Sequence, residues 1–262
     1  MDKAIFIPTR GRIGKQLTYN HFSKNILNNH KVKLVCTNDE SKHHRKLGYK
    51  TLICPIEGIG SKRQWIMEYA KLKNIKYTMM CDDDITDFFI RKSNKAFNLR
   101  KTSIEELEKL IEDIFILNKK YPFSGLSYRS GNNNFFPKKI ATCVRSWGIF
   151  SINTRLFFKN KIRFDRLQCM EDFDVILQFL EKGYENAIIT NAAWDSVSNA
   201  PGGCSIYRNE KVQKEYAIKL KELHNGFVSI SERKTKSSWK GMQKRIDVII
   251  QWKKAFNSSM KG

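Results

Sequence analysis

The stretch "KYTMMCDDD" (residues 76–84) joins an apolar run to three consecutive aspartates. The apolar residues predict a short buried strand, which places the aspartates at its carboxyl end. Alternate side chains of a strand share a face, so we expect Asp82 and Asp84 to point together and Asp83 to point away. Ligands of open α/β folds bind beyond the carboxyl ends of the strands, and two carboxylates there suit Mg²⁺ or Mn²⁺. The alternative interpretation is an acidic turn in which Asp87 caps a following helix.

Three further apolar runs precede this one, and each predicts a strand. They are "KAIFIP" (residues 3–8), "KVKLVC" (residues 31–36) and "KTLIC" (residues 50–54). Helical patterns lie between them around residues 15–29 and 58–74, the second with Ser61 as a candidate N-cap. Strands that alternate with helices indicate βαβ units, so we predict an α/β, Rossmann-like fold with a mainly parallel sheet flanked by helices.

The second half of the chain ends in a basic segment. Before it come an amphipathic helix over residues 102–120, a helix over residues 171–183 and a strand over residues 186–195. Residues 205–262 hold 14 Lys or Arg against 5 Asp or Glu, with helical periodicity over residues 209–225 and 238–256. We predict a catalytic domain over residues 1–204 and a basic helical extension, residues 205–262, packed on it.

Positive charge dominates the composition. Of the 262 residues, 48 are Lys or Arg and 26 are Asp or Glu, so the formal net charge is +22. This excess favours a polyanionic partner, because each phosphate that Lys or Arg neutralises releases condensed counterions. The alternative is a basic surface that only water contacts. No apolar run approaches the ~20 residues of a membrane span, and the N-terminus lacks a signal-peptide pattern, so we expect a cytoplasmic protein without membrane contact.

Two basic, glycine-containing loops should meet the aspartates at one edge of the sheet. "PTRGR" (residues 8–12) ends the first strand, and "GSKR" (residues 60–63) begins the helix before the acidic strand. "WG" (residues 147–148) and "ED" (residues 171–172) follow later in the chain. The order of these motifs resembles that of the GT-A glycosyltransferases.

The resemblance implies a site for a UDP-sugar. By their motifs, the donor-binding residues would be Thr9, Arg10, Arg12, Lys62, Arg63, Asp82, Asp83, Trp147 and Gly148. Mn²⁺ or Mg²⁺ would be held by Asp84 and Asp82, with Asp84 the expected direct ligand and Asp83 the most expendable of the three. Many members of the family add a late His to the metal, but this chain has none in the corresponding region, so Asp195 would take its place.

A glycosyl transfer also needs a carboxylate within hydrogen-bond reach of the acceptor hydroxyl. The candidates are Glu171, Asp172 and Asp174, at the start of a predicted helix. Asp172 is the first choice as base in an inverting displacement, and Glu171 is the next. The alternative is that these residues only place negative charge at a helix N-terminus, which stabilises a helix by about 0.3 to 1 kcal/mol.

The charge excess and the segment "YRSGNNNFFPKK" (residues 128–139) bear on the acceptor. With the glycosyltransferase motifs, they resemble the DNA-modifying enzymes of the TET-associated and base J glucosyltransferase group, found in phages among others. The resemblance implies a monomer, in the host cytoplasm if viral, that transfers a sugar to the hydroxymethyl group of 5-hydroxymethylcytosine in duplex DNA. The target base would have to leave the stack, and Phe135 or Phe136 would fill the gap.

Two alternatives remain from the residues. A cytosolic glycosyltransferase acting on a polysaccharide, glycolipid or protein would share the core, and its basic tail would bind an anionic membrane. A metal-dependent DNA nuclease would share the basicity and the clustered carboxylates, but it does not require "PTRGR" at the end of the first strand.

Overall fold

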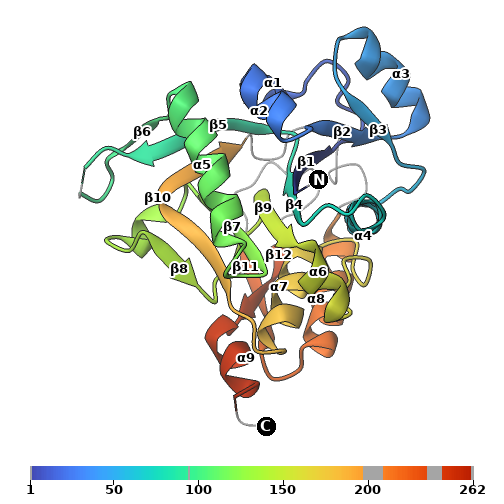
Figure 1. The fold of residues 1–262 in the computed structure, drawn as a ribbon. Coiled ribbons are helices and arrows are strands. Elements are labelled where there is room, and N and C mark those ends of the chain that lie inside the picture. The colour runs from blue at the N-terminus through green and yellow to red at the C-terminus, as the bar shows by residue number, and fades with distance from the viewer. Residues whose placement is uncertain (1, 94, 197–208, 235–243, 261–262) are drawn as a thin grey trace.

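The computed structural model describes residues 2–93, 95–196, 209–234 and 244–260 (Figure 1). Its centre is a ten-stranded sheet in the order β3-β2-β1-β4-β9-β7-β10-β5-β6, with β8 paired to β10. The strands are β1 (Lys3–Pro8), β2 (Lys33–Cys36), β3 (Thr51–Ile53), β4 (Tyr77–Cys81), β5 (Ile85–Arg91), β6 (Leu99–Lys101), β7 (Phe123–Tyr128), β8 (Ile140–Thr142), β9 (Ile149–Asn153) and β10 (Asn186–Ser196). Helices lie on the faces of this sheet, so the predicted α/β fold class is confirmed.

The first half of the chain forms the parallel part of the sheet. β1 pairs in parallel with both β2 and β4, and β2 pairs in parallel with β3. The connections contain α1 (Leu17–His21), α2 (Lys24–Asn29), α3 (Asn38–Lys46) and α4 (Ile59–Leu72). The prediction that Ser61 caps α4 is wrong, because the helix begins after Gly58, whose positive φ of 81° suits a glycine.

The second half adds strands of both directions beside β4. β9 pairs antiparallel with β4 and β7, β7 pairs in parallel with β10, and β10 pairs antiparallel with β5. β5 follows the aspartates directly and turns back as β6, so Asp87 lies in a strand and caps no helix. The helices here are α5 (Ile104–Leu117), the 3₁₀ helix η1 (Asn132–Phe135), α6 (Thr154–Lys159) and α7 (Glu171–Leu180).

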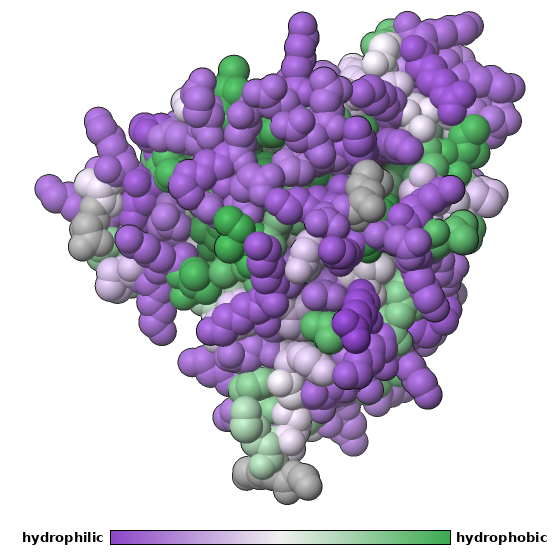
Figure 2. Space-filling view, in the orientation of Figure 1, coloured by the Kyte–Doolittle hydropathy of each residue, from purple (hydrophilic) through white to green (hydrophobic). Residues whose placement is uncertain are grey.

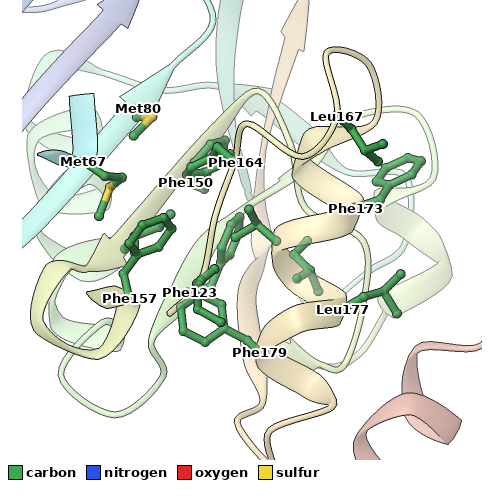
Figure 3. Packing of buried hydrophobic residues seen from close by; sticks show 14 of the residues in the cluster. Met67, Met80, Phe123, Phe150, Phe157, Phe164, Leu167, Phe173, Leu177 and Phe179 are labelled. Carbon is green, nitrogen blue, oxygen red and sulfur yellow. The ribbon is translucent and has the colours of Figure 1, made fainter. Parts of the chain in front are cut away.

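An aromatic core lies between the sheet and α7 (Figure 3). The rings of Phe123 and Phe150 stack at 4.8 Å between centroids, and Phe164 stacks on Phe150 at 6.1 Å. Every residue of α7 is buried, including the acidic residues of its first turn. The carboxylates of α7 are therefore carried by one of the most enclosed elements of the fold.

The C-terminal extension is only partly helical. It consists of α8 (Glu210–Leu223), β11 (Val228–Lys234), β12 (Lys244–Ile250) and α9 (Trp252–Ser258). The helix predicted over residues 238–256 is wrong for β12, which forms a hairpin with β11. Its residues Ile246, Val248 and Ile250 pack on the core with a period of two, the pattern of a strand.

Buried ionic and aromatic contacts join this extension to α7. His224, which follows α8, lies with Nε2 2.7 Å from Asp174 Oδ1 and Nδ1 2.6 Å from Glu181 Oε1. Burial lowers the pKa of His224, but the two carboxylates outweigh that effect and raise it above its ordinary value. Trp252 of α9 meets the edge of Phe173 at 5.8 Å. The position of α7 therefore depends on residues far along the chain.

The five described cysteines are buried and form no disulfide with one another, whereas Cys204 lies outside the described residues. Among the helices of the described ranges, none combines the length and the apolar character that crossing a bilayer requires.

Candidate active site

The three aspartates form a short turn between β4 and β5, which we call the acidic loop (Asp82–Asp84). Asp82 N donates to the carbonyl oxygen of Gly148 at 2.6 Å. The Thr18 hydroxyl donates to the carbonyl oxygen of Asp82 and accepts from Ile85 N at 3.0 Å. Backbone contacts from two sides thus hold the acidic loop at the carboxyl end of β4.

Asp83 is the buried member of the acidic loop. Its carboxylate accepts a hydrogen bond from Thr9 Oγ1 at 2.5 Å and forms an ion pair with Arg12. Its side chain is 7% exposed, and burial raises its pKa to about 6 against the opposing effects of Arg12 and Thr9. Asp83 thus fastens the acidic loop to the segment after β1, which argues against the expectation that it is the most expendable of the three aspartates.

Asp82 and Asp84 are the aspartates that solvent reaches. Their side chains are 34% and 21% exposed, in agreement with the predicted alternation. Asp82 accepts from Arg63 at 2.7 Å, and Asp84 lies 3.1 Å from Arg12. Partial burial, which penalises the charged form, and the nearby carboxylates raise the pKa of Asp82 to about 7, against the opposing charge of Arg63.

Arg63 of α4 connects the acidic loop to α7. One guanidinium nitrogen donates to Asp82, and another donates to Glu171 Oε1 at 2.5 Å. Its Cζ atom also lies 5.0 Å from the ring centroid of Phe150. The neighbouring Lys62 donates to the carbonyl oxygen of Thr9 at 3.0 Å, and burial lowers its pKa. The "PTRGR", "GSKR", "DDD" and "ED" motifs are thus joined in one network of contacts.

The "WG" motif, Trp147 and Gly148, also lies beside the acidic loop. Gly148 has a positive φ of 72°, and a Cβ atom there would lie 2.1 Å from the Trp194 ring. Only glycine therefore fits between the acidic loop and this indole. The Trp147 ring lies 5.7 Å from Trp194, and Arg145 covers it at 3.9 Å.

Two of the predicted site residues, Arg10 and Asp195, pair with residues outside this network. Arg10 pairs with Glu57 at 2.7 Å, and both side chains are largely exposed. Asp195 pairs with Arg129 at 3.2 Å. Across the described ranges, no three His, Cys, Asp or Glu side chains gather closely enough to hold a metal, so Asp195 does not complete a three-residue site with Asp82 and Asp84.

The three acidic residues of α7 differ in their contacts. Glu171 is engaged by Arg63, and Asp174 is fully buried beside His224, Arg166 and Gln178. These contacts give Asp174 a role in holding α7 and leave no room for an acceptor. Asp172 is 9% exposed, at the N-terminal end of α7 next to Glu171.

Gln16 and Thr18 belong to this network but to none of the motifs predicted from the sequence. The Gln16 side-chain amide donates to both Thr9 Oγ1 and the carbonyl oxygen of Arg12, each at 2.9 Å. Thr18 holds the acidic loop as described above. Both residues follow "PTRGR" in a segment for which the sequence predicts only a helix. The tertiary fold places them beside the aspartates.

Residues 3–203 match the sequence pattern of the TET-associated glycosyltransferases. The chain belongs to this family. The predicted resemblance is confirmed, and membership in the TET-associated glycosyltransferase family decides against the nuclease alternative. The match ends within the stretch before α8, so it leaves out the C-terminal extension.

Solved structures share the fold of this TET-associated glycosyltransferase at low sequence identity. A mannosyltransferase from Pyrobaculum calidifontis, solved with GDP-mannose and Mn²⁺, has a TM-score of 0.52 and 10% identity over 84% of this chain and 62% of its own. A mycobacterial protein has a TM-score of 0.51 and 7% identity over 95% of this chain and 84% of its own. Comparison with curated protein sequences gives no match.

Proposed function

We propose that this glycosyltransferase moves a sugar from a UDP-sugar, with the help of a divalent cation, to the hydroxymethyl group of 5-hydroxymethylcytosine in DNA. The observation that carries the proposal is the acidic loop, held against the "PTRGR" segment by Thr9 and Arg12 in a chain of this family. The donor diphosphate would lie over this loop, and the acceptor would approach from the side of α7.

The acidic loop fits a divalent cation by its charge and its oxygen donors. The network contains four carboxylates, those of Asp82 to Asp84 and Glu171, and three cations, Arg12, Arg63 and Lys62; Asp82 and Asp84 are the aspartates of the loop that solvent reaches. Asp84 and Asp82 would hold Mn²⁺ or Mg²⁺, and water and diphosphate oxygens would supply the other ligands. When bound, the ion neutralises the charge that develops on the departing diphosphate. The mannosyltransferase of similar fold was solved with Mn²⁺ and a nucleotide sugar.

Asp172 is the proposed base. Glu171 is already paired with Arg63, so its carboxylate keeps Arg63 turned toward Asp82. Asp172 is the next residue on α7, and no ion pair holds it among the described residues. It would take the proton of the acceptor hydroxyl while that oxygen bonds to the anomeric carbon and the bond from this carbon to UDP breaks.

The charge of the chain supports DNA as the acceptor. A neutral glycan acceptor does not require a net charge of +22, whereas this charge favours binding to the phosphate backbone of DNA. The extension contributes to this excess, with Lys211, Lys214, Lys219 and Lys221 on α8.

The direct test incubates the full chain with Mn²⁺, a panel of UDP-sugars and duplex DNA that contains either 5-hydroxymethylcytosine or cytosine. After digestion to nucleosides, mass spectrometry should find a hexose or pentose adduct on the hydroxymethylated nucleoside only. An adduct on a glycan or lipid but on no DNA would overturn the acceptor assignment. UDP binding without a need for Mn²⁺ would overturn the metal assignment.

Asp172→Asn should lower turnover on hydroxymethylated DNA by about 10²- to 10⁴-fold, since the amide cannot take the proton. The dissociation constant for UDP in Mn²⁺ should change little, because Asp172 lies outside the contacts that hold the acidic loop. Rates at saturating DNA and calorimetric UDP titrations measure the two effects. The matched control is Asp165→Asn, which removes a half-buried carboxylate paired with Arg163 and should keep wild-type turnover. Equal loss in both variants would contradict the assignment.

A further inference from the structure

Two basic loops meet at the β6 edge of the sheet and form what we call the basic lobe: the described residues of 91–100 and residues 129–139. Figure 1 shows the β5–β6 hairpin and the segment after β7 side by side at the left of the molecule. Neither segment contains an acidic residue, and Figure 2 shows a largely hydrophilic surface there. The lobe is therefore a local concentration of the positive charge of the chain.

Buried hydrogen bonds fix the two loops to each other. Asn132 is fully buried, and its amide donates to Ser127, to the Thr190 carbonyl oxygen at 2.9 Å and to the Ala192 carbonyl oxygen at 3.1 Å. Arg91 of β5 donates to Asn132 and, at 3.2 Å, to Asn133. The lobe is thus built on the sheet.

One large apolar side chain stands out from this basic surface. Phe97 is 84% exposed, and its backbone has a positive φ of 58°, which a bulky residue rarely adopts. Its amide donates to Asn133 Oδ1 at 2.8 Å, so the neighbouring loop holds this conformation. Phe135 and Phe136, the aromatic residues predicted from the sequence, are only half-buried, and Phe136 lies under Arg91 at 5.3 Å.

The free charges around Phe97 match a polyanion. Lys92 and Lys95 are exposed on its own loop, and Lys138 and Lys139 are exposed on the other. Within the described ranges, no acidic side chain forms an ion pair with any of these four lysines, whereas Arg100 and Arg129 are paired. DNA-binding proteins commonly combine such lysines, which bind the phosphate backbone, with an exposed aromatic ring that contacts the bases.

We infer that the basic lobe binds duplex DNA beside the modified base, with Phe97 in contact with the bases of a groove. The inference rests on the proposed function. β5 runs from the acidic loop to the lobe over seven residues, about 23 Å at ~3.3 Å per residue. Successive phosphates of one strand are about 3.4 Å apart along the duplex axis, so in a complex whose duplex axis follows β5 the lobe meets DNA about 6 to 7 base pairs from the active site, on one side only.

The test compares Lys92→Ala/Lys95→Ala and Phe97→Ala with matched controls. Lys42→Ala/Lys46→Ala removes two exposed lysines of α3, and Leu72→Ala removes a side chain that is 75% exposed at the end of α4. The lysine variant should lower the slope of log affinity against log salt by about 2 on an unmodified 24-base-pair duplex, and Phe97→Ala should weaken binding about 10-fold. The controls should bind as the wild type does.

A second measurement uses the one-sided geometry. Two duplexes carry 5-hydroxymethylcytosine three base pairs from either end, so that only one of them extends toward the lobe. The wild type should modify one of the two faster, and the lobe variants should lose that preference. The inference that the basic lobe binds DNA would be contradicted if the wild type modified both duplexes at equal rates. It would also be contradicted if the lobe variants bound DNA as tightly as the wild type. Lobe-dependent binding to anionic phosphatidylserine vesicles in place of DNA would also overturn it. Absence of transfer to any DNA would instead sink the proposed function, while the salt slopes would still test the lobe.

Discussion

Asp84→Asn should lower sugar transfer to less than about one thousandth of the wild-type rate. The substitution replaces a carboxylate by a weak neutral ligand at the aspartate proposed to hold the cation, and that ion would supply several kcal/mol of leaving-group stabilisation. Calorimetry should show that UDP binding no longer depends on Mn²⁺. Thermal unfolding should stay close to that of the wild type, because Asp83 still fastens the acidic loop to Thr9 and Arg12.

The matched control is Asp87→Asn, three residues further along. Asp87 lies on β5, its side chain is 26% exposed, and it pairs with Lys101 at 2.6 Å. An exposed pair contributes at most about 1 kcal/mol, so this variant should keep its activity within about fivefold. Full activity and Mn²⁺-dependent UDP binding in Asp84→Asn would show that the cation is held elsewhere.

Asp174→Ala should lower the free energy of unfolding by about 3 to 5 kcal/mol, a large part of the stability of an ordinary domain. The side chain is fully buried, and its removal leaves His224, Arg166 and Gln178 without their shared acceptor. Chemical denaturation measures the change. Asp165→Ala, which breaks only the exposed pair with Arg163, should cost at most about 1 kcal/mol. Equal costs would contradict the buried network.

The pH dependence of stability gives a second readout of the same network. The pKa of His224 is raised, so its protonation stabilises the fold fully below the unfolded value of about 6.5 and ceases to do so as the pH rises through the folded value. Asp174, Glu181 and Arg166 are the charged groups around it. The wild type should therefore lose stability as the pH rises above about 6.5, and Asp174→Ala should lose less.

The sequence was sufficient for the parallel half of the fold. β1, β2, β3 and β4 are apolar runs with turn residues at their ends, which local pattern alone reveals. β12 was missed because "RIDVII" satisfies a helical and a strand period equally well over so few residues, and the packing of Ile246, Val248 and Ile250 decides between them. The β5–β6 hairpin gave no clear signal, since its loop lacks the usual Asn-Gly or Asp-Gly pair.

For the site, motif order predicted which segments meet but not which atoms do. The pairing of Arg12 with Asp83 spans 71 positions, and that of His224 with Asp174 spans 50, so no local pattern records either contact. From the sequence alone, Asp83 is therefore the aspartate expected to be most expendable, and Asp174 is one of the candidate bases. Partners decide such roles, and partners depend on the tertiary fold.

The contacts of α7 with the C-terminal extension set an order of events during synthesis. Synthesis from the N-terminus makes the acidic loop early, but Asp174 and Phe173 can meet His224 and Trp252 only after residues 224 and 252 have left the ribosome. Until then, the helix that carries Glu171 and Asp172 lacks its outer support. Under the proposed function, the acceptor side at α7 would therefore be completed after the donor side at the acidic loop.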